Sequence, residues 1–261
     1  MKFQLKNIVA IIAVTLVLVS CSKDDESVND VTGIGSVKLE FDQVYKDANF
    51  AANTAYINSN GEVVKVTKAK YIVSNIELVR FDGSVYTVPK SESYFIIDDL
   101  APETTLLQLP NIPAGNYTKV KFGIGVDEAQ FSLGATGQGD FLTTAQDAGM
   151  MWSWSAGYKF VAFEGTFTSA TVTTDAQFKV HTGKTGTDYN YTTVTLDFPD
   201  NALVRANIIP QIHIMADLSQ LIDGTNKINL SEQATIMGGT KLPLITANIS
   251  NMFEVHHVHN D

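Results

Sequence analysis

Cysteine is almost absent from this chain, because Cys21 is the only one among 261 residues. A disulfide needs two cysteines, so no internal disulfide can hold the fold together. Long apolar runs are equally scarce. The one that stands out, Ile8–Val19, is too short to cross a bilayer core comfortably, since a spanning helix needs roughly 20 apolar residues. The sequence therefore predicts no transmembrane helix after this run.

The start of the chain has the pattern of a cleaved export signal. Lys2 and Lys6 precede the apolar run, and the segment Leu18–Cys21 resembles a lipobox, in which the cysteine sulfur is acylated and becomes the new N-terminus. We therefore expect residues 1–20 to be a lipoprotein signal peptide and Cys21 to be the lipid anchor.

The next segment, residues 21–35, is small, polar and acidic, so it buries too little apolar surface to fold and is expected to be a flexible tether. Its segment Ser22–Glu26 resembles the surface-export signal of Bacteroidota lipoproteins. This pattern predicts an outer-membrane lipoprotein of the cell envelope exposed at the surface, with a periplasm-facing position as the alternative. A single folded domain is expected over residues 36–261.

Basic residues are outnumbered in this chain. It has 18 Lys and Arg against 28 Asp and Glu, which gives a formal net charge of −10. An acidic surface without a basic patch repels phosphate backbones, so we expect no nucleic-acid partner.

Catalytic motifs are missing as well. The pair Gly123 and Gly125 lacks the third glycine of a dinucleotide fingerprint, and Gly183-Lys184-Thr185 lacks the earlier glycine of a phosphate loop. No G-x-S-x-G elbow and no H-E-x-x-H zinc helix occurs in the sequence. The chain is therefore predicted not to be an enzyme.

Short alternating segments dominate what is present. Ser36–Phe41 alternates strictly, and Lys70–Phe81 is rich in β-branched and aromatic residues before a turn at Asp82-Gly83. Further strands are predicted at Tyr94–Ile97, Thr104–Leu109, Tyr117–Val126, Met150–Thr168, Gln177–His181, Thr192–Phe198, Ala206–Asp217, Thr225–Leu230 and Phe253–His259. Helix is expected only at Asp140–Asp147 and near Leu218–Ile222. The pattern predicts an all-β antiparallel sandwich of about a dozen strands with little helix.

The segment Met150–Gly165 has an unusual composition. If it is extended, Met150, Trp152 and Trp154 project to one face and gather both tryptophans of the chain beside a thioether. Chemistry alone leaves two interpretations open, namely core packing and a ligand or metal site.

Several motifs in this order resemble the MbnP-like copper-binding proteins, which occur beside methanobactin genes and more widely in Bacteroidota. The matching segments are Lys70–Leu78, Ile112–Tyr117, Phe122–Asp127, Met150–Gly165, Phe178–Gly183 and Ile212–Leu221. The resemblance implies an exported β-sandwich that binds copper. In some members a tryptophan is oxidised to kynurenine by a partner di-haem protein and serves as a ligand beside histidines.

Carried over to this chain, the resemblance implies that Trp152 or Trp154 is the modified position and that His181 is the matching histidine ligand. Imidazole suits copper, and an oxidised tryptophan would supply an amine nitrogen or a carbonyl oxygen that indole lacks. The chain departs from the family pattern in one respect. Copper-binding relatives tend to have a further histidine earlier in the domain or next to the tryptophan, whereas here no histidine precedes His181.

The other histidines need a separate interpretation. His213 lies in an apolar alternation, where a hydrogen-bonded structural residue is the alternative to a metal ligand. On a regular strand His257 and His259 share a face and His256 points away, so His257 and His259 could bind one ion, with a solvated tail as the alternative.

Together these features predict an exported lipoprotein that binds copper for uptake, storage or sequestration. The alternative from another class is a surface adhesion or glycan-binding module that uses exposed Trp and Tyr rings as platforms. A purely structural envelope lipoprotein is a third interpretation.

Overall fold

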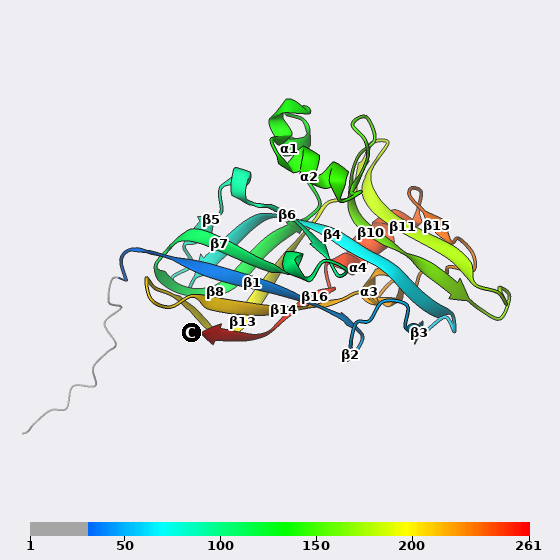
Figure 1. Ribbon diagram of the computed structural model, residues 1–261, viewed down its shortest axis with the longest axis horizontal. Helices are drawn as coiled ribbons and strands as arrows, with labels where there is room; N and C mark the ends of the chain where they lie inside the picture. Colours follow the sequence, from blue (N-terminus) through cyan, green and yellow to red (C-terminus); the bar gives the residue numbers. More distant parts are fainter. Residues whose placement is uncertain (1–30) are drawn as a thin grey trace, which may run out of the picture. The chain divides into compact units, whose positions relative to one another are not determined.

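The computed structural model describes residues 31–261 (Figure 1). The predicted signal peptide, Cys21 and most of the predicted tether lie outside the described residues. Strand β1 begins at Ile34, close to the expected start of the domain at residue 36. Within residues 31–261, no helix is both long enough and apolar enough to cross a membrane.

One sheet has five strands in the order β16-β14-β1-β2, with β7 also paired to β1. Its strands are β1 (Ile34–Tyr45), β2 (Ala48–Asn49), β7 (Leu106–Pro113), β14 (Pro210–Asp217) and β16 (Phe253–Asn260). The predicted alternation at the start of β1 is confirmed, because Val37, Leu39 and Phe41 are buried. The pairing of β1 with β14 is parallel.

The other sheet has eleven strands around the central order β12-β11-β10-β4-β8-β13. Its strands are β3 (Ala55–Ile57), β4 (Val63–Arg80), β5 (Val85–Thr87), β6 (Tyr94–Asp98), β8 (Gly115–Ile124), β9 (Met151–Ser153), β10 (Gly157–Thr168), β11 (Ala176–Thr185), β12 (Asp188–Tyr189), β13 (Thr192–Val204) and β15 (Thr235–Ile236). The predicted all-β sandwich is confirmed. Its pairing is antiparallel except for β1 with β14 and β11 with β15.

The helices of the described residues are short. They are α1 (Glu128–Phe131), α2 (Phe141–Asp147), α3 (Gln220–Asp223) and α4 (Lys241–Ile249), with 3-10 turns at Lys90–Glu92, Pro102–Thr104 and Thr136–Gln138. The predicted helix at Asp140–Asp147 and the turn near Leu218–Ile222 correspond to α2 and α3. Helices α1 and α4 were not predicted.

Two predicted strands are corrected by the structure. Thr225–Leu230 is a loop, although Ile228 and Leu230 are buried, because hydrogen bonds between Asn226 and Asn248 hold it against α4. Met150–Thr168 is divided by a turn after Ser153 into β9 and β10. Burial alternates in Thr225–Leu230, so alternation alone did not reveal that this segment is a loop.

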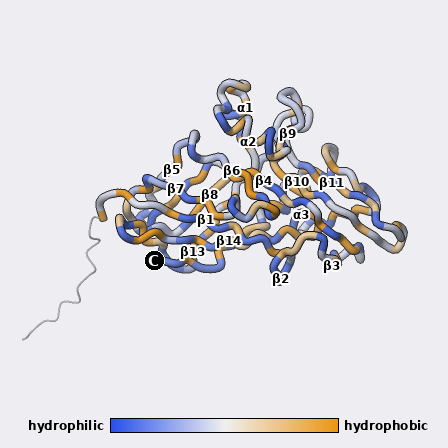
Figure 2. The backbone as a smooth tube through the Cα atoms, in the orientation of Figure 1, coloured by the Kyte–Doolittle hydropathy of each residue, from blue (hydrophilic) through white to orange (hydrophobic). Residues whose placement is uncertain are grey.

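The core lies between the two sheets, and hydrophobic residues alternate with hydrophilic ones along the strands that enclose it (Figure 2). Its aromatic centre joins Phe41 and Phe253 of the five-stranded sheet to Tyr71 and Phe122 of the eleven-stranded sheet. The ring centroids of Phe41 and Phe122 are 5.6 Å apart and those of Phe122 and Phe253 are 5.3 Å apart, both edge to face. Such pairs add to the stabilisation from area burial.

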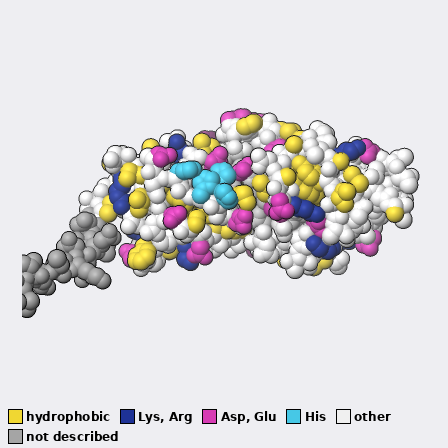
Figure 3. Space-filling model, turned by 90° about the horizontal axis from the view of Figure 1, so that it is seen from below, with side chains coloured by type: hydrophobic (Ala, Val, Ile, Leu, Met, Phe, Trp, Pro, Cys, Tyr) yellow, Lys and Arg dark blue, Asp and Glu magenta, His cyan; other side chains and the backbone are white. Residues whose placement is uncertain are grey.

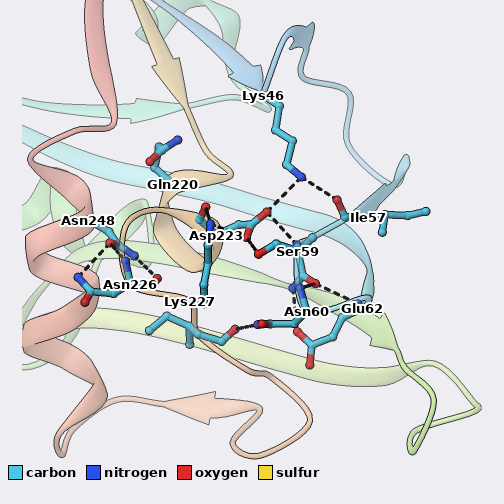
Figure 4. A network of polar contacts seen from close by, with 12 residues as sticks. Lys46, Ile57, Ser59, Asn60, Glu62, Gln220, Asp223, Asn226, Lys227 and Asn248 are labelled. Atoms are coloured by element: carbon cyan, nitrogen blue, oxygen red, sulfur yellow. Dashed lines mark hydrogen bonds and ion pairs between the residues drawn. The ribbon is translucent and has the colours of Figure 1, made fainter.

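Buried carboxylates fasten the loop after α3 to the turn between β3 and β4 (Figure 4). Glu62 is 1% exposed and accepts hydrogen bonds from Asn58 Nδ2 at 2.8 Å, from the Ser231 amide at 2.7 Å and from the Ser231 hydroxyl at 2.8 Å. Asp223 accepts from Ser59 and pairs with Lys227 at 3.1 Å. These bonds replace the water that the carboxylates give up on folding.

Replacing Glu62 by alanine is expected to lower the free energy of unfolding by about 2–4 kcal/mol, because it leaves several buried donors without an acceptor. Denaturant unfolding of the full chain measures the change. The control is Glu92→Ala, which removes an exposed carboxylate and should cost less than about 0.5 kcal/mol. Equal stabilities of the two variants would contradict the role of this network.

Candidate metal centre

The structure places the two tryptophans in different surroundings. Trp152 lies in β9, whereas Trp154 lies in the turn that follows it. The side chains of Met150, Trp152 and Trp154 therefore do not share the predicted extended face. Trp154 stacks on Phe131, with ring centroids 5.0 Å apart. Met150 is fully buried. Because the chain turns after Ser153, Trp152 and Trp154 contact different parts of the molecule.

Trp152 and His181 are brought together from β9 and β11. Their ring centroids are 6.1 Å apart with an interplanar angle of 51°. Gly183 permits this approach, because a Cβ there would lie 2.9 Å from Trp152 Cζ3. Both sequence-predicted residues therefore lie in one place, although 29 positions separate them in the sequence.

A carboxylate orients the His181 ring. His181 Nε2 lies 2.9 Å from Glu164 Oε1, and Lys68 Nζ donates to the same oxygen at 2.9 Å. Burial alone would raise the pKa of Glu164, but the hydrogen bonds from Lys68 and His181 outweigh it and lower the pKa. An ionised carboxylate can only accept, so the ring proton of neutral His181 is on Nε2 and the lone pair is on Nδ1.

The other ring nitrogen of His181 is unsatisfied. Nδ1 is buried and has no hydrogen-bond partner among the described residues. Burial lowers the pKa of His181, and Lys159 and Lys68 add to the effect against the opposing influence of Glu164. The neutral ring therefore persists to lower pH than that of an ordinary histidine. A histidine that donates one N–H to a carboxylate and leaves the other nitrogen free has the arrangement typical of a metal ligand.

A shallow depression of about 400 Å³ adjoins Trp152. Its lining includes the thioether residue Met237 as well as Ser155 and Lys184. Thioether sulfur suits monovalent copper, and Met237 was not singled out from the sequence.

The remaining histidines gather on the other sheet. His213 of β14 pairs in register with His257 of β16, and their rings stack with centroids 4.6 Å apart. His256 Nδ1 lies 2.7 Å from His257 Nδ1, and the His259 ring centroid lies 4.5 Å from that of His257. We refer to His213, His256, His257 and His259 as the histidine cluster.

The prediction that His256 points away from its neighbours is wrong. The pairing of β14 with β16 passes from His213↔His257 to Ile214↔Val255 and so skips His256. Such a β-bulge sets two residues opposite one and shifts the side-chain alternation. His256 therefore joins His257 on the outer side.

The predicted site residues thus occupy two separate places. His181 and Trp152 belong to the eleven-stranded sheet, whereas the histidine cluster lies on the outer face of the five-stranded sheet. Trp154 belongs to neither group, because its ring stacks on Phe131. Sequence reasoning did not select Glu164, although a charged residue within the apolar run of β10 was a signal for it.

A β-sandwich whose strands present imidazole nitrogens without hydrogen-bond partners is a candidate metal-binding protein. The chain is a member of the MbnP family, whose model matches residues 34–238. This family is associated with copper, so membership fits a copper-related role. Trp152, His181 and His213 lie inside the matched segment, and the histidines of β16 lie beyond it.

The solved structure of MbnP from Methylosinus trichosporium is similar to this chain, with a TM-score of 0.49 and 15% sequence identity. The alignment covers 80% of this chain and 82% of that one. The search of curated proteins found no match.

Proposed function

We propose that this protein binds copper and that Trp152 and His181 form the site. The observation that carries the proposal is the unpartnered Nδ1 of His181 beside the Trp152 ring. Imidazole nitrogen suits copper, and Glu164 already holds the ring in the tautomer that a metal requires. We propose a binding protein, without turnover of its own.

One imidazole alone is a weak ligand set, so the site needs further donors. Oxidation of Trp152 to kynurenine, by a di-haem partner protein as in relatives, would add a nitrogen or oxygen donor next to His181. Of the two tryptophans, Trp152 is the proposed position, because the Trp154 ring stacks on Phe131 instead. The Met237 thioether lines the same depression as Trp152.

The protein is proposed to act in the cell envelope. The lipobox-like segment ending at Cys21 would anchor it to the outer membrane, and the acidic segment after it would direct it to the surface. Copper uptake, storage or sequestration are the roles that suit a tethered binding protein with no catalytic motif.

Glycan binding is the second candidate. Trp152 is only half-buried and lines the depression together with Ser155 and Thr185, an aromatic and hydroxyl surface to which a sugar ring could bind. Fluorescence quenching of Trp152 in a Trp154→Phe background would separate the two functions. Quenching by copper supports the first, and quenching by glycans alone supports the second.

Metal analysis of the full chain from its native host, together with intact mass, tests the proposal. We expect bound copper, the mass gain of one kynurenine located at Trp152, and loss of one copper equivalent in His181→Ala. Trp154→Phe is the matched control for Trp152→Phe and should retain the copper that Trp152→Phe loses. A native protein with unmodified tryptophans and no copper would overturn the assignment.

A further inference from the structure

The histidine cluster forms one patch on the surface of the protein (Figure 3). The candidate ligand atoms of His213, His256 and His257 all lie within 4.8 Å of one another. His259 is exposed on the same strand, with its ring next to that of His257. Three strands contribute to the patch and its border, because the carboxylates of Glu40 and Asp42 on β1 lie beside His213.

The β-bulge in β16 builds this patch. Val255 and Val258 both pack against the core. On a regular strand, two residues point to the same side only when they are an even number of positions apart, and these two are three apart. The two residues between them, His256 and His257, are therefore both left on the outer side opposite His213. A regular strand would have turned one of these two rings into the core.

One ring nitrogen of the cluster lacks the partner that a buried polar atom normally has. His213 Nδ1 is buried without a hydrogen-bond partner among residues 31–261. His256 Nδ1 and His257 Nδ1 face each other, so at most one of them can carry a proton directed at the other. A polar nitrogen that is buried without a partner costs free energy unless an ion or water satisfies it.

Two carboxylates on β1 lie beside His213. Its Nε2 lies 3.8 Å from Glu40 Oε2 and 3.8 Å from Asp42 Oδ2, so a proton on Nε2 faces two negative charges. The lone pair of the neutral ring is then on Nδ1, the atom without a partner. The two charges also attract a cation to the patch.

One ring of the histidine cluster has a shifted pKa. Burial lowers the pKa of His257, and His213, His259 and His256 contribute to the shift by charge repulsion. Crowded imidazoles disfavour each other's protonated forms, so the neutral His257 ring persists to lower pH than an ordinary histidine.

From this geometry we propose that His213, His256 and His257, with His259 as a fourth donor, form a second metal site that takes a divalent transition-metal ion, copper(II) first. A set of imidazoles without thiolate suits copper(II), nickel(II) and zinc(II), and copper(II) has the highest affinity in that series. The site is separate from Trp152 and His181. Its β16 ligands lie outside the part of the chain that the family model matches.

Binding at this site would connect the C-terminal strand β16 to β14. An ion that binds the folded chain and not the unfolded chain stabilises the fold. Copper(II) is therefore expected to raise the Tm of the full chain in proportion to the logarithm of its concentration. In the His181→Ala background, where the first proposed site is removed, the same dependence should disappear when His256 and His257 are also replaced by alanine.

Calorimetric titration of the full chain in detergent with copper(II) sulfate tests the proposal. Wild type and His181→Ala are each expected to bind one copper(II) equivalent at the histidine cluster. The His256→Ala/His257→Ala variant is expected to bind this equivalent at least tenfold more weakly. His181→Ala is the matched control, since it makes the same substitution on the other sheet. The two proposals are thus tested separately. Copper lost only in His181→Ala tests the proposed function, and copper lost only in the double variant tests the histidine cluster.

Electron paramagnetic resonance of copper(II) bound to the His181→Ala protein gives a second readout that needs no change in the cluster. We expect hyperfine splitting from at least three equatorial imidazole nitrogens. Unchanged affinity in the double variant, or a copper(II) spectrum with oxygen ligands only, would overturn the second site.

Discussion

Replacing Phe41 by alanine is expected to lower the free energy of unfolding by about 3–5 kcal/mol, the range found when a large buried aromatic side chain is removed. Phe41 is 1% exposed, and its ring contacts those of Tyr71, Phe122 and Phe253 with centroids at 6.2, 5.6 and 6.2 Å. These three rings come from both sheets. The truncation therefore leaves a cavity where the sheets meet as well as losing the apolar area of the ring.

Denaturant unfolding of the full chain measures the effect, and Phe81→Ala is the matched control. Phe81 is 76% exposed, so the same truncation there should change the free energy of unfolding by less than about 0.5 kcal/mol. A cost below about 1 kcal/mol for Phe41→Ala would mean that the core collapses around the missing ring or that the sheets do not meet at this residue.

Local alternation predicted most of the longer strands because one of their faces is buried. The segment around Phe41 is an example, since its inward residues are recognisable from sequence alone. Pairing between strands depends on contacts across long sequence separations, and the parallel alignment of β1 with β14 left no local signal. The loop at Thr225–Leu230 alternates like a strand because Ile228 and Leu230 are buried from a loop that side-chain hydrogen bonds hold in place.

The histidine cluster was only partly predictable for a related reason. His213 and His257 come from segments far apart in the sequence, and only the sheet register makes them neighbours. The role of His256 did have a local signal. Val255 and Val258 are three positions apart, and two inward-facing valines at that spacing indicate a β-bulge between them.

The resemblance, and not residue spacing, implied that Trp152 or Trp154 lies beside His181. Nothing in the periodicity of β9 or β11 says that their side chains meet, and the turn that separates Trp152 from Trp154 was not anticipated. Glu164 became relevant only through the register, which pairs Ala162 with His181 and so places Glu164 close to the imidazole. The charge of Glu164 within an apolar run was a local signal, but only the strand pairing shows which side chain this carboxylate orients.

Replacing Glu164 by glutamine is expected to weaken copper binding at His181 by about 10–100-fold, the usual effect of losing a group that orients a metal-bound histidine. The glutamine amide can donate as well as accept, so it no longer forces the ring proton onto Nε2. With the proton on Nδ1, the lone pair is on Nε2 and points at the amide. The affinity is to be measured in the His256→Ala/His257→Ala background, where the histidine cluster does not compete for the ion.

Glu77→Gln is the matched control, because Glu77 pairs with Lys121 at 3.1 Å much as Glu164 pairs with Lys68, but contacts no histidine among the described residues. It should leave copper affinity unchanged. Nitrogen NMR of His181 without metal gives a readout that is independent of copper, with the proton on Nε2 in the wild type and a mixture of tautomers in Glu164→Gln. If the mixture appeared while affinity held, His181 would bind copper without help from Glu164. If neither the tautomer nor the copper affinity changed, Glu164 would not be the group that places the ring proton on Nε2. Another interaction would then have to explain why Nδ1 is unprotonated.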